Sequence, residues 1–246
     1  MSDEKLTDNK PPFWQRLLSW LVTLATPVAL VLLTIRLLIN PLFLEIEYRT
    51  PGFPEDRYGF TLEERLYWSK ITVDYLINDE GIDYLADLRF PEGQSVPQPS
   101  CGFVEDCSQV YNARELRHMV DVKNVVGISM IVLWVALGLL LFSGAVAWLG
   151  GWLPLYANAL ARGGWLTVAL TVSIILFVLL AFGVIFVWFH EIFFEAGTWS
   201  FYYSDTLIRL FPERFWRDTF LIVAGLPALI GAALGYFLGT RPRRKA

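Results

Sequence analysis

Charged residues are scarce in this sequence. They make up 18% of its 246 residues, whereas an ordinary soluble domain carries about 25%. Apolar residues account for 55% of the chain, and the mean hydropathy is +0.46. This balance argues against an ordinary soluble domain and indicates a membrane protein, provided that the apolar residues form continuous runs.

The sequence also lacks the short motifs of several enzyme classes. The stretch that begins at His190 starts like the metalloprotease motif H-E-x-x-H, but position 194 is Phe. No G-x-S-x-G elbow, phosphate-binding loop or G-x-G-x-x-G fingerprint is present. The cysteines lack the C-x2-C spacing of zinc sites. We therefore expect no metal site, and the acidic outer surface predicted below speaks against nucleic acid as a partner.

Four apolar runs are long enough to cross a membrane, because a bilayer core of about 30 Å takes about 20 apolar residues in a helix. They span residues 17–39, 124–149, 164–189 and 219–238. The last three contain no charged residue. The sequence therefore predicts an all-α membrane protein with four transmembrane helices.

Positive charges near the helix ends predict the orientation, since Lys and Arg accumulate on the cytoplasmic side. Eight lie in the flanks that four helices place together with both termini, against three in segment 190–218. We therefore expect a multi-pass protein of the bacterial cell membrane with both termini in the cytoplasm. The cytoplasmic parts would be the tail 1–16, the turn 150–163 and the basic tail 239–246. The extracytoplasmic parts would be a cap, 40–123, and an aromatic-rich segment, 190–218.

The predicted cap is acidic and mostly helical. Residues 41–122 contain 16 acidic and 7 basic residues. Thr61 with Glu64, and Asn112 with Glu115, have the spacing of the capping box that begins a helix. The second of these helices would continue into the apolar run 124–149.

Cys101 and Cys107 are the only cysteines, and both lie in the predicted cap. Because extracytoplasmic compartments allow disulfides to form, we expect a bridge between them. Two free thiols are the alternative.

Histidine is almost as rare as cysteine, and its two occurrences have matching positions. His118 precedes the second apolar run by about six residues, and His190 directly follows the third. These two helices run in opposite directions and are joined by a short turn, so both histidines lie near the outer interface. Histidine is the side chain whose ordinary pKa suits proton transfer near neutral pH. An interfacial histidine can also be a simple amphipathic anchor, but two at one depth favour a shared site.

Several neighbours are candidates for binding substrate or orienting the histidines. Glu115 and Asp121 lie three residues either side of His118, and either could hold its tautomer. The stretch 188–216 contains 11 aromatic residues, most of which fit an interfacial aromatic belt. The remaining candidates are Arg117, Trp199, Tyr203 and Asp205. Asp205 could instead form a helical ion pair with Arg209, four residues on.

Three stretches carry a family resemblance: "RYGFTLEERLYWSKITVDYLI", "ARELRHMVDVKNVV" and "FHEIFFEAGTWSFYYSDTLIRLFPERFW". Together with the four apolar runs around them, they resemble the bacterial lipoprotein intramolecular transacylase family. The resemblance covers the chain from about Arg36 to Trp216, and its most specific parts contain the two histidines. The cysteine loop is not part of it.

The resemblance implies an acyltransferase that needs no cofactor. Its substrate would be a lipoprotein in the membrane whose N-terminal cysteine carries a diacylglyceryl group and a free amine. An acyl chain would move from the glyceryl sn-2 oxygen to that amine and leave a lyso-form lipoprotein. No nucleophilic serine or cysteine would be required.

His118 and His190 are the predicted catalytic residues for this transfer. One imidazole would take the proton of the amine, and the other would act as acid or hydrogen-bond donor. The residues do not decide which is which. Our hypothesis makes His118 the base, because Glu115 and Asp121 would raise its basicity.

Two other classes of protein fit the same residues. A bis-histidine haem protein could place iron between two imidazoles. A binding or sensory protein could use the acidic cap to recognise a ligand without performing any chemistry.

Overall fold

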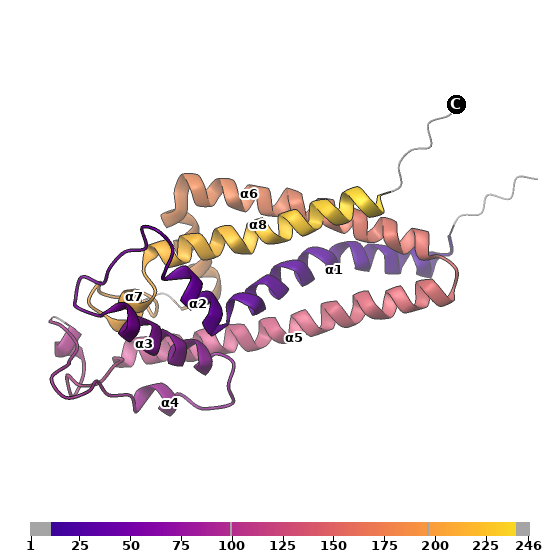
Figure 1. The fold of residues 1–246 in the computed structure, drawn as a ribbon. Helices are drawn as coiled ribbons and strands as arrows, with labels where there is room; N and C mark the ends of the chain where they lie inside the picture. Colours follow the sequence, from indigo (N-terminus) through magenta and orange to yellow (C-terminus); the bar gives the residue numbers. More distant parts are fainter. Residues whose placement is uncertain (1–10, 99, 196, 240–246) are drawn as a thin grey trace, which may run out of the picture.

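The computed structural model describes residues 11–98, 100–195 and 197–239, and this part of the chain is helical nearly throughout (Figure 1). Four of its helices are long and apolar enough to cross a membrane. They are α1 (Phe13–Leu38), α5 (Ala113–Leu149), α6 (Leu153–Phe193) and α8 (Glu213–Leu238). The predicted fold class, an all-α protein with four membrane helices, is confirmed.

The helices extend beyond the predicted apolar runs. α5 already begins at Ala113, because Asn112 and Glu115 form a reciprocal capping box at its first turn. α6 begins at Leu153, so the turn expected at 150–163 is only a few residues long. Gly151 closes this turn with a φ of +73°, a conformation that glycine adopts without steric cost. Both helices therefore include polar residues that precede the apolar runs 124–149 and 164–189.

Small residues let the membrane helices approach closely, as is usual where lipid replaces water. α6 packs along α8, and α1 contacts α5, α6 and α8. A Cβ added to Gly231 of α8 would lie 2.6 Å from the carbonyl oxygen of Gly164 on α6. The hydroxyl of Thr23 on α1 donates to the carbonyl of Ala159 on α6 at 3.1 Å. These contacts leave no room for larger side chains along the seams.

The outer surfaces of the bundle are apolar. In the most apolar window of α5, and likewise of α6, only 11% of the residues are buried in the protein. Large side chains such as Leu141, Phe142 and Leu180 point outward, and Leu180 is 84% exposed. Such a surface suits contact with hydrocarbon chains.

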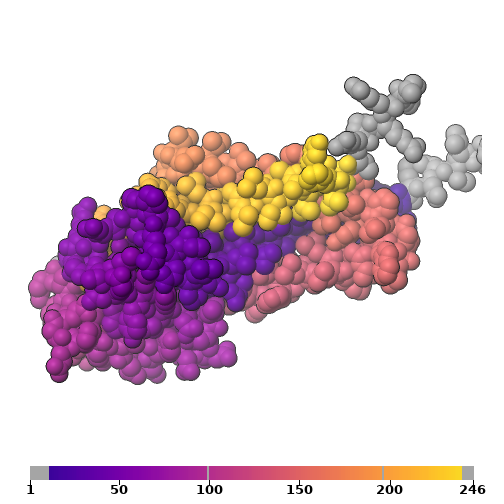
Figure 2. All heavy atoms as spheres, viewed as in Figure 1, coloured from indigo at the N-terminus to yellow at the C-terminus, as the bar shows by residue number. Residues whose placement is uncertain are grey.

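The cap is built from short helices at one end of the bundle, opposite the α5–α6 turn (Figure 1). Figure 2 shows its indigo to magenta residues gathered into one mass at that end. The helices are α2 (Pro41–Glu47), α3 (Leu62–Tyr75), α4 (Asp83–Ala86), the 3-10 helix η1 (Ser100–Phe103) and α7 (Thr206–Leu210). Buried side chains from all parts of the cap form one apolar core that includes Leu44, Trp68, Leu85, Val110 and Leu210.

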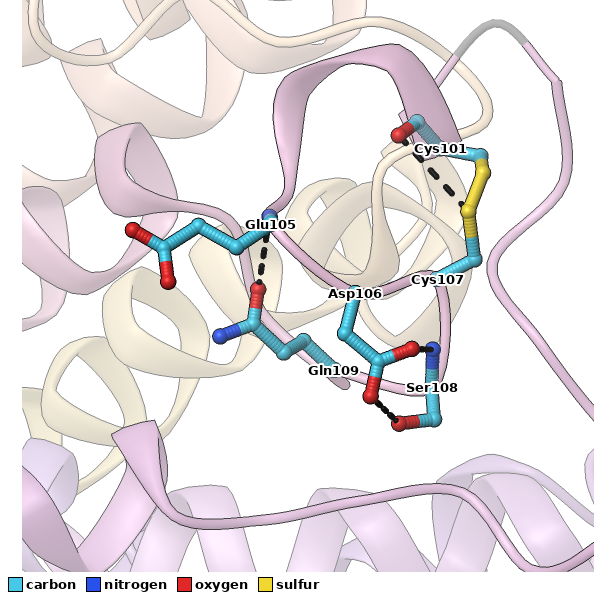
Figure 3. The surroundings of a disulfide bond; sticks show 6 residues. All are labelled: Cys101, Glu105, Asp106, Cys107, Ser108 and Gln109. Carbon is cyan, nitrogen blue, oxygen red and sulfur yellow. Dashed lines mark hydrogen bonds between the residues drawn. A yellow bond between two sulfur atoms is a disulfide. The ribbon is translucent and has the colours of Figure 1, made fainter.

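Two predicted local features of the cap are present. Thr61 and Glu64 form the capping box at the start of α3. Cys101 and Cys107 are joined by a disulfide, with Cα atoms 5.0 Å apart (Figure 3). Within the same loop, Asp106 accepts hydrogen bonds from the backbone amide and the hydroxyl of Ser108. The loop is therefore fixed both covalently and by its own polar groups.

Candidate active site

The two histidines lie side by side where the bundle meets the cap. The ring centroids of His118 and His190 are 6.0 Å apart, and the ring planes differ by 21°. Each residue is only 8% exposed. His118 belongs to the second turn of α5 and His190 to the last turn of α6. The two histidines, which lie at matching depth in the predicted helices, are therefore neighbours in the fold.

The two histidines do not meet through close packing of α5 against α6 along their lengths. α1 lies between much of α5 and α6 (Figure 1). α5 and α6 each contact α1 more extensively than they contact each other. α6 also loses helical geometry at Ala181, where φ is −151° and ψ is 49°. The last turns of α6, which carry His190, thus follow a break in the helix.

The ring of His190 is held in one orientation. Its Nδ1 lies 2.7 Å from the carbonyl oxygen of Phe186, one turn earlier on α6. A carbonyl oxygen can only accept, so Nδ1 carries the proton and Nε2 of the neutral ring has a free lone pair. A fixed tautomer with Nε2 unprotonated is the form that a general base requires.

His118 is less constrained by polar contacts. Its Nδ1 is buried, and it has no hydrogen-bond partner among the described residues. Glu115 does not orient the ring, because its two oxygens accept from the backbone amides of Asn112 and Leu207. Asp121 makes no hydrogen bond or ion pair within the described part of the chain. The reason for expecting His118 to be the more basic residue is therefore absent.

Aromatic rings enclose the pair. Phe194 contacts both imidazoles, with centroids at 4.8 Å from His118 and 5.4 Å from His190. Phe201 packs on His118 at 5.3 Å, and Phe186 packs on His190 at 4.2 Å. These walls exclude water from most of the site and suit an apolar substrate.

Two predicted aromatic candidates have different positions. Trp199 packs on His190, with a centroid distance of 4.9 Å and an interplanar angle of 36°. Its indole Nε1 is buried and has no hydrogen-bond partner among the described residues. Tyr203 is 84% exposed and lies on the surface. Only Trp199 therefore belongs to the immediate surroundings of the histidines.

Asp205 is fully buried and connects three parts of the chain. It accepts hydrogen bonds from the hydroxyl of Ser100, the side chain of Asn112, the guanidinium of Arg114 and the backbone amide of Tyr202, at 2.8–3.2 Å. Arg114 in turn lies 5.8 Å from the centroid of Phe201, which packs on His118. Asp205 thus positions one wall of the site without touching either histidine.

The remaining charged candidates lie outside this network. The alternative ion pair between Asp205 and Arg209 is wrong, since Arg209 pairs with Asp56 at 2.9 Å. Arg117 is exposed.

Sequence reasoning missed Ser100 and the walls Phe186, Phe194 and Phe201. For Phe186 a signal existed, because it lies four residues before His190 on α6 and therefore shares its helix face. Phe194 directly follows the end of α6 and has an extended backbone, so helical spacing does not place it. Ser100 and Phe201 had none, since their partners lie far away in the sequence.

The arrangement can perform proton transfer on an apolar molecule that lies in the membrane surface. Each of the two imidazoles can accept or donate a proton, and Trp199 adds an N–H donor without a partner among the described residues. The described residues contain no group of three or more His, Cys, Asp or Glu side chains that could hold a metal ion.

Comparison with known proteins agrees with this fold. The model of the family described as "Lipoprotein intramolecular transacylase Lit" matches residues 20–216. An uncharacterized protein of Aquifex aeolicus (strain VF5) is 28% identical over 218 residues, which is 88% of this chain and 91% of the relative.

Solved structures show the same fold at low identity. The membrane integral lipoprotein intramolecular transacylase Lit from Bacillus cereus superposes with a TM-score of 0.71 at 19% identity, covering 92% of this chain and 94% of that one. A variant of the Bacillus cereus protein with one histidine replaced by alanine gives a TM-score of 0.66 at 17% identity, with 92% of each chain covered.

Proposed function

This chain belongs to the lipoprotein intramolecular transacylase family and is a multi-pass membrane acyltransferase, and we propose that it transfers the sn-2 acyl chain of a diacylglyceryl-cysteine lipoprotein to the N-terminal amine of the same molecule. Donor and acceptor then share one substrate, so neither a second substrate nor a cofactor is consumed. The product is an N-acyl, lyso-form lipoprotein.

The proposed reaction conserves atoms and protons. The neutral amine attacks the ester carbonyl carbon, a C–N bond forms, and the carbonyl oxygen becomes an oxyanion. The intermediate collapses, and the bond between the carbonyl carbon and the sn-2 oxygen breaks. The proton lost by the nitrogen ends on the leaving oxygen, giving an amide and a free hydroxyl.

We assign the general base to His190. The supporting observation is the bond from its Nδ1 to the carbonyl of Phe186, which leaves Nε2 available to take the proton of the amine. This reverses the earlier hypothesis, which rested on contacts of Glu115 and Asp121 that His118 does not have.

His190 then passes this proton to one ring nitrogen of His118, and His118 releases the proton of its other ring nitrogen to the leaving oxygen. It lies next to His190 and has one ring nitrogen without a partner. A neutral imidazole can accept a proton on one nitrogen and release one from the other, so no charge accumulates on His118 over the cycle. A positioned acid–base pair typically contributes about 10²–10⁴-fold in rate.

The aromatic walls suit a lipid substrate. Bringing the amine and the ester carbonyl together within one molecule requires a confined space, and Phe194, Phe201 and Trp199 restrict the space around the two rings. Correct alignment of reacting groups can supply several kcal/mol of the barrier. We propose that these rings hold the acyl ester against the histidines.

The proposed orientation places the site on the extracytoplasmic side, with both termini in the cytoplasm. It is supported by the eight-to-three bias of Lys and Arg and by the disulfide in the cap, since disulfides persist in oxidising compartments. Membrane lipids would surround the bundle, and the lipoprotein would reach the site from the outer leaflet.

The single observation that carries the proposal is the contact between the only two histidines in the chain, inside an apolar site at the end of the bundle. We set aside a bis-histidine haem protein and a binding or sensory protein, because the chain belongs to a family of acyltransferases.

The test is to co-express the protein with a reporter lipoprotein in a bacterium that lacks other N-acylating enzymes. Mass spectrometry of the reporter's N-terminal peptide should find the acyl group on the amine at unchanged total mass. His118→Ala and His190→Ala should each abolish the transfer while the protein remains folded in the membrane. An unmoved acyl chain beside folded wild-type protein would refute the proposal, and activity retained by either variant would refute the two-histidine site.

A further inference from the structure

We propose that the indole N–H of Trp199 donates a hydrogen bond to the oxygen of the ester carbonyl and stabilises the oxyanion that forms when the amine attacks. The inference rests on the proposed transacylase reaction and adds a third catalytic residue to it.

The first observation is an unused donor. Nε1 of Trp199 is buried and has no partner among the described residues. Indole nitrogen can only donate, and a buried tryptophan N–H normally finds an acceptor. Leaving such a group without a partner costs free energy. The substrate's carbonyl oxygen would remove this cost.

The second observation is the position of the ring. Trp199 packs directly on His190, the proposed base, with centroids 4.9 Å apart. A carbonyl whose carbon is attacked by an amine next to His190 therefore has its oxygen close to this indole. Phe186, Phe189, Phe194 and Phe201 also pack against the histidines, but phenylalanine has no N–H to donate. Among the described aromatic rings on the histidine pair, the indole is the donor.

The third observation is that the segment carrying Trp199 is fixed on both sides. Before it, the hydroxyl of Thr198 donates to the carbonyl of Glu195 at 2.8 Å, and Gly197 adopts a φ of +86°. After it, the amide of Tyr202 donates to Asp205 at 2.9 Å. A donor held in place before the reaction stabilises developing charge without reorganisation.

The proposed reaction as described so far assigns no residue to stabilise the oxyanion. His190 takes the proton of the amine and His118 returns it, so both imidazoles are engaged in proton transfer. The oxyanion still needs a donor in a site from which water is largely excluded. Removing one such donor typically lowers kcat by about 10²–10³-fold.

The experiment compares Trp199→Phe with wild type and with Trp188→Phe, using the full-length protein in detergent and a synthetic diacylglyceryl-cysteine lipopeptide. Trp188 lies on α6 near the site but is 54% exposed, so it controls for the loss of one indole. We expect Trp199→Phe to lower kcat by about 10²-fold or more with little change in KM, and Trp188→Phe to keep wild-type activity.

The pH profile separates this role from a role in proton transfer. An indole N–H does not titrate between pH 5 and 9, so the profile of Trp199→Phe should keep its shape at a lower height. Insertion of benzothienylalanine at position 199 replaces N–H by sulfur in a side chain of nearly the same shape. It should reproduce the loss of kcat even if the phenylalanine variant folds poorly.

Wild-type kcat in both variants at position 199, or a defect confined to KM, would overturn the inference and leave Trp199 as a wall of the site. Absence of acyl transfer by the wild-type protein would instead refute the proposed function, so the two failures can be told apart.

Discussion

The membrane bundle and the cap are stabilised by opposite means. In the bundle, hydroxyls such as those of Thr26, Thr34 and Thr167 donate to carbonyls of their own helix, and the helices meet through small residues. In the cap, charged side chains are buried and paired across long sequence distances, as with Arg209 and Asp56. Close contact between small residues therefore determines how the bundle helices pack. In the cap, buried ion pairs join distant segments in addition to the apolar core.

The active site lies at the boundary between these two regions. Both histidines come from bundle helices, whereas Trp199, Phe201 and Asp205 come from the segment between α6 and α7. The bundle brings the imidazoles to the same depth, and the polar network fixes the walls around them. The comparison predicts that the two regions respond differently to substitution.

The largest effect is expected from Asp205→Ala. The substitution removes the shared acceptor of Ser100, Asn112, Arg114 and the amide of Tyr202. Breaking a buried ion pair by removing one partner typically costs about 3–5 kcal/mol. We expect the cap to lose this much stability and the enzyme to lose activity, while the helices remain inserted.

Hydrogen exchange of cap and bundle peptides provides the measurement. Asp79→Ala, at an exposed position of the cap, is the control and should behave like wild type. Equal protection of cap amides in wild type and Asp205→Ala would show that the network is not what holds the cap.

An intermediate effect is expected from Gly164→Ala in the bundle. The added Cβ would overlap the backbone carbonyl of Gly231, so α6 and α8 would have to separate. Overpacking of this kind typically costs about 1–3 kcal/mol. Gly138→Ala is a matched control, because its Cβ would meet nothing within 4 Å and alanine favours a helix over glycine by about 1 kcal/mol.

Unfolding by increasing fractions of denaturing detergent measures both glycine variants. We expect Gly164→Ala to unfold earlier than wild type and Gly138→Ala at the same point or later. The reverse order would mean that close helix contact does not determine the stability of the bundle.

The last effect depends on pH and is expected where cap and bundle meet at Glu47. This residue of α2 is buried, and burial together with the nearby carboxylate of Asp218 on α8 raises its pKa to about 7. Its proton is therefore bound more tightly in the folded than in the unfolded protein, where the pKa of glutamate is about 4.3. Stability should fall as the pH rises between these two values and then level off above about 7.

Glu47→Gln should remove this dependence, because the amide is neutral at every pH. The measurement is the detergent unfolding midpoint between pH 5 and pH 8, with Glu63→Gln on the exposed side of α3 as control. An unchanged slope in Glu47→Gln would assign the pH dependence to other groups.

Patterns local in sequence predicted the elements of this protein. Continuous apolar runs gave the four membrane helices, and the Thr61–Glu64 spacing gave the start of α3. The meeting of His118 and His190 followed from their matching depth. Partner choice could not be predicted in this way: Asp205 pairs with Arg114 rather than with Arg209, and Glu115 binds Leu207 rather than His118. These choices are decided by contacts between segments more than 90 residues apart.

The same long-range bonds impose an order on biosynthesis. Glu115 and Ser100 are made early, but their partners Leu207 and Asp205 follow 92 and 105 residues later. At a synthesis rate of about 5–20 residues per second, these polar groups wait about 5–20 seconds before they can be buried. The cap is therefore completed only after α6 has crossed the membrane, and a nascent chain that ends before residue 205 holds both histidines without the network that fixes the walls around them.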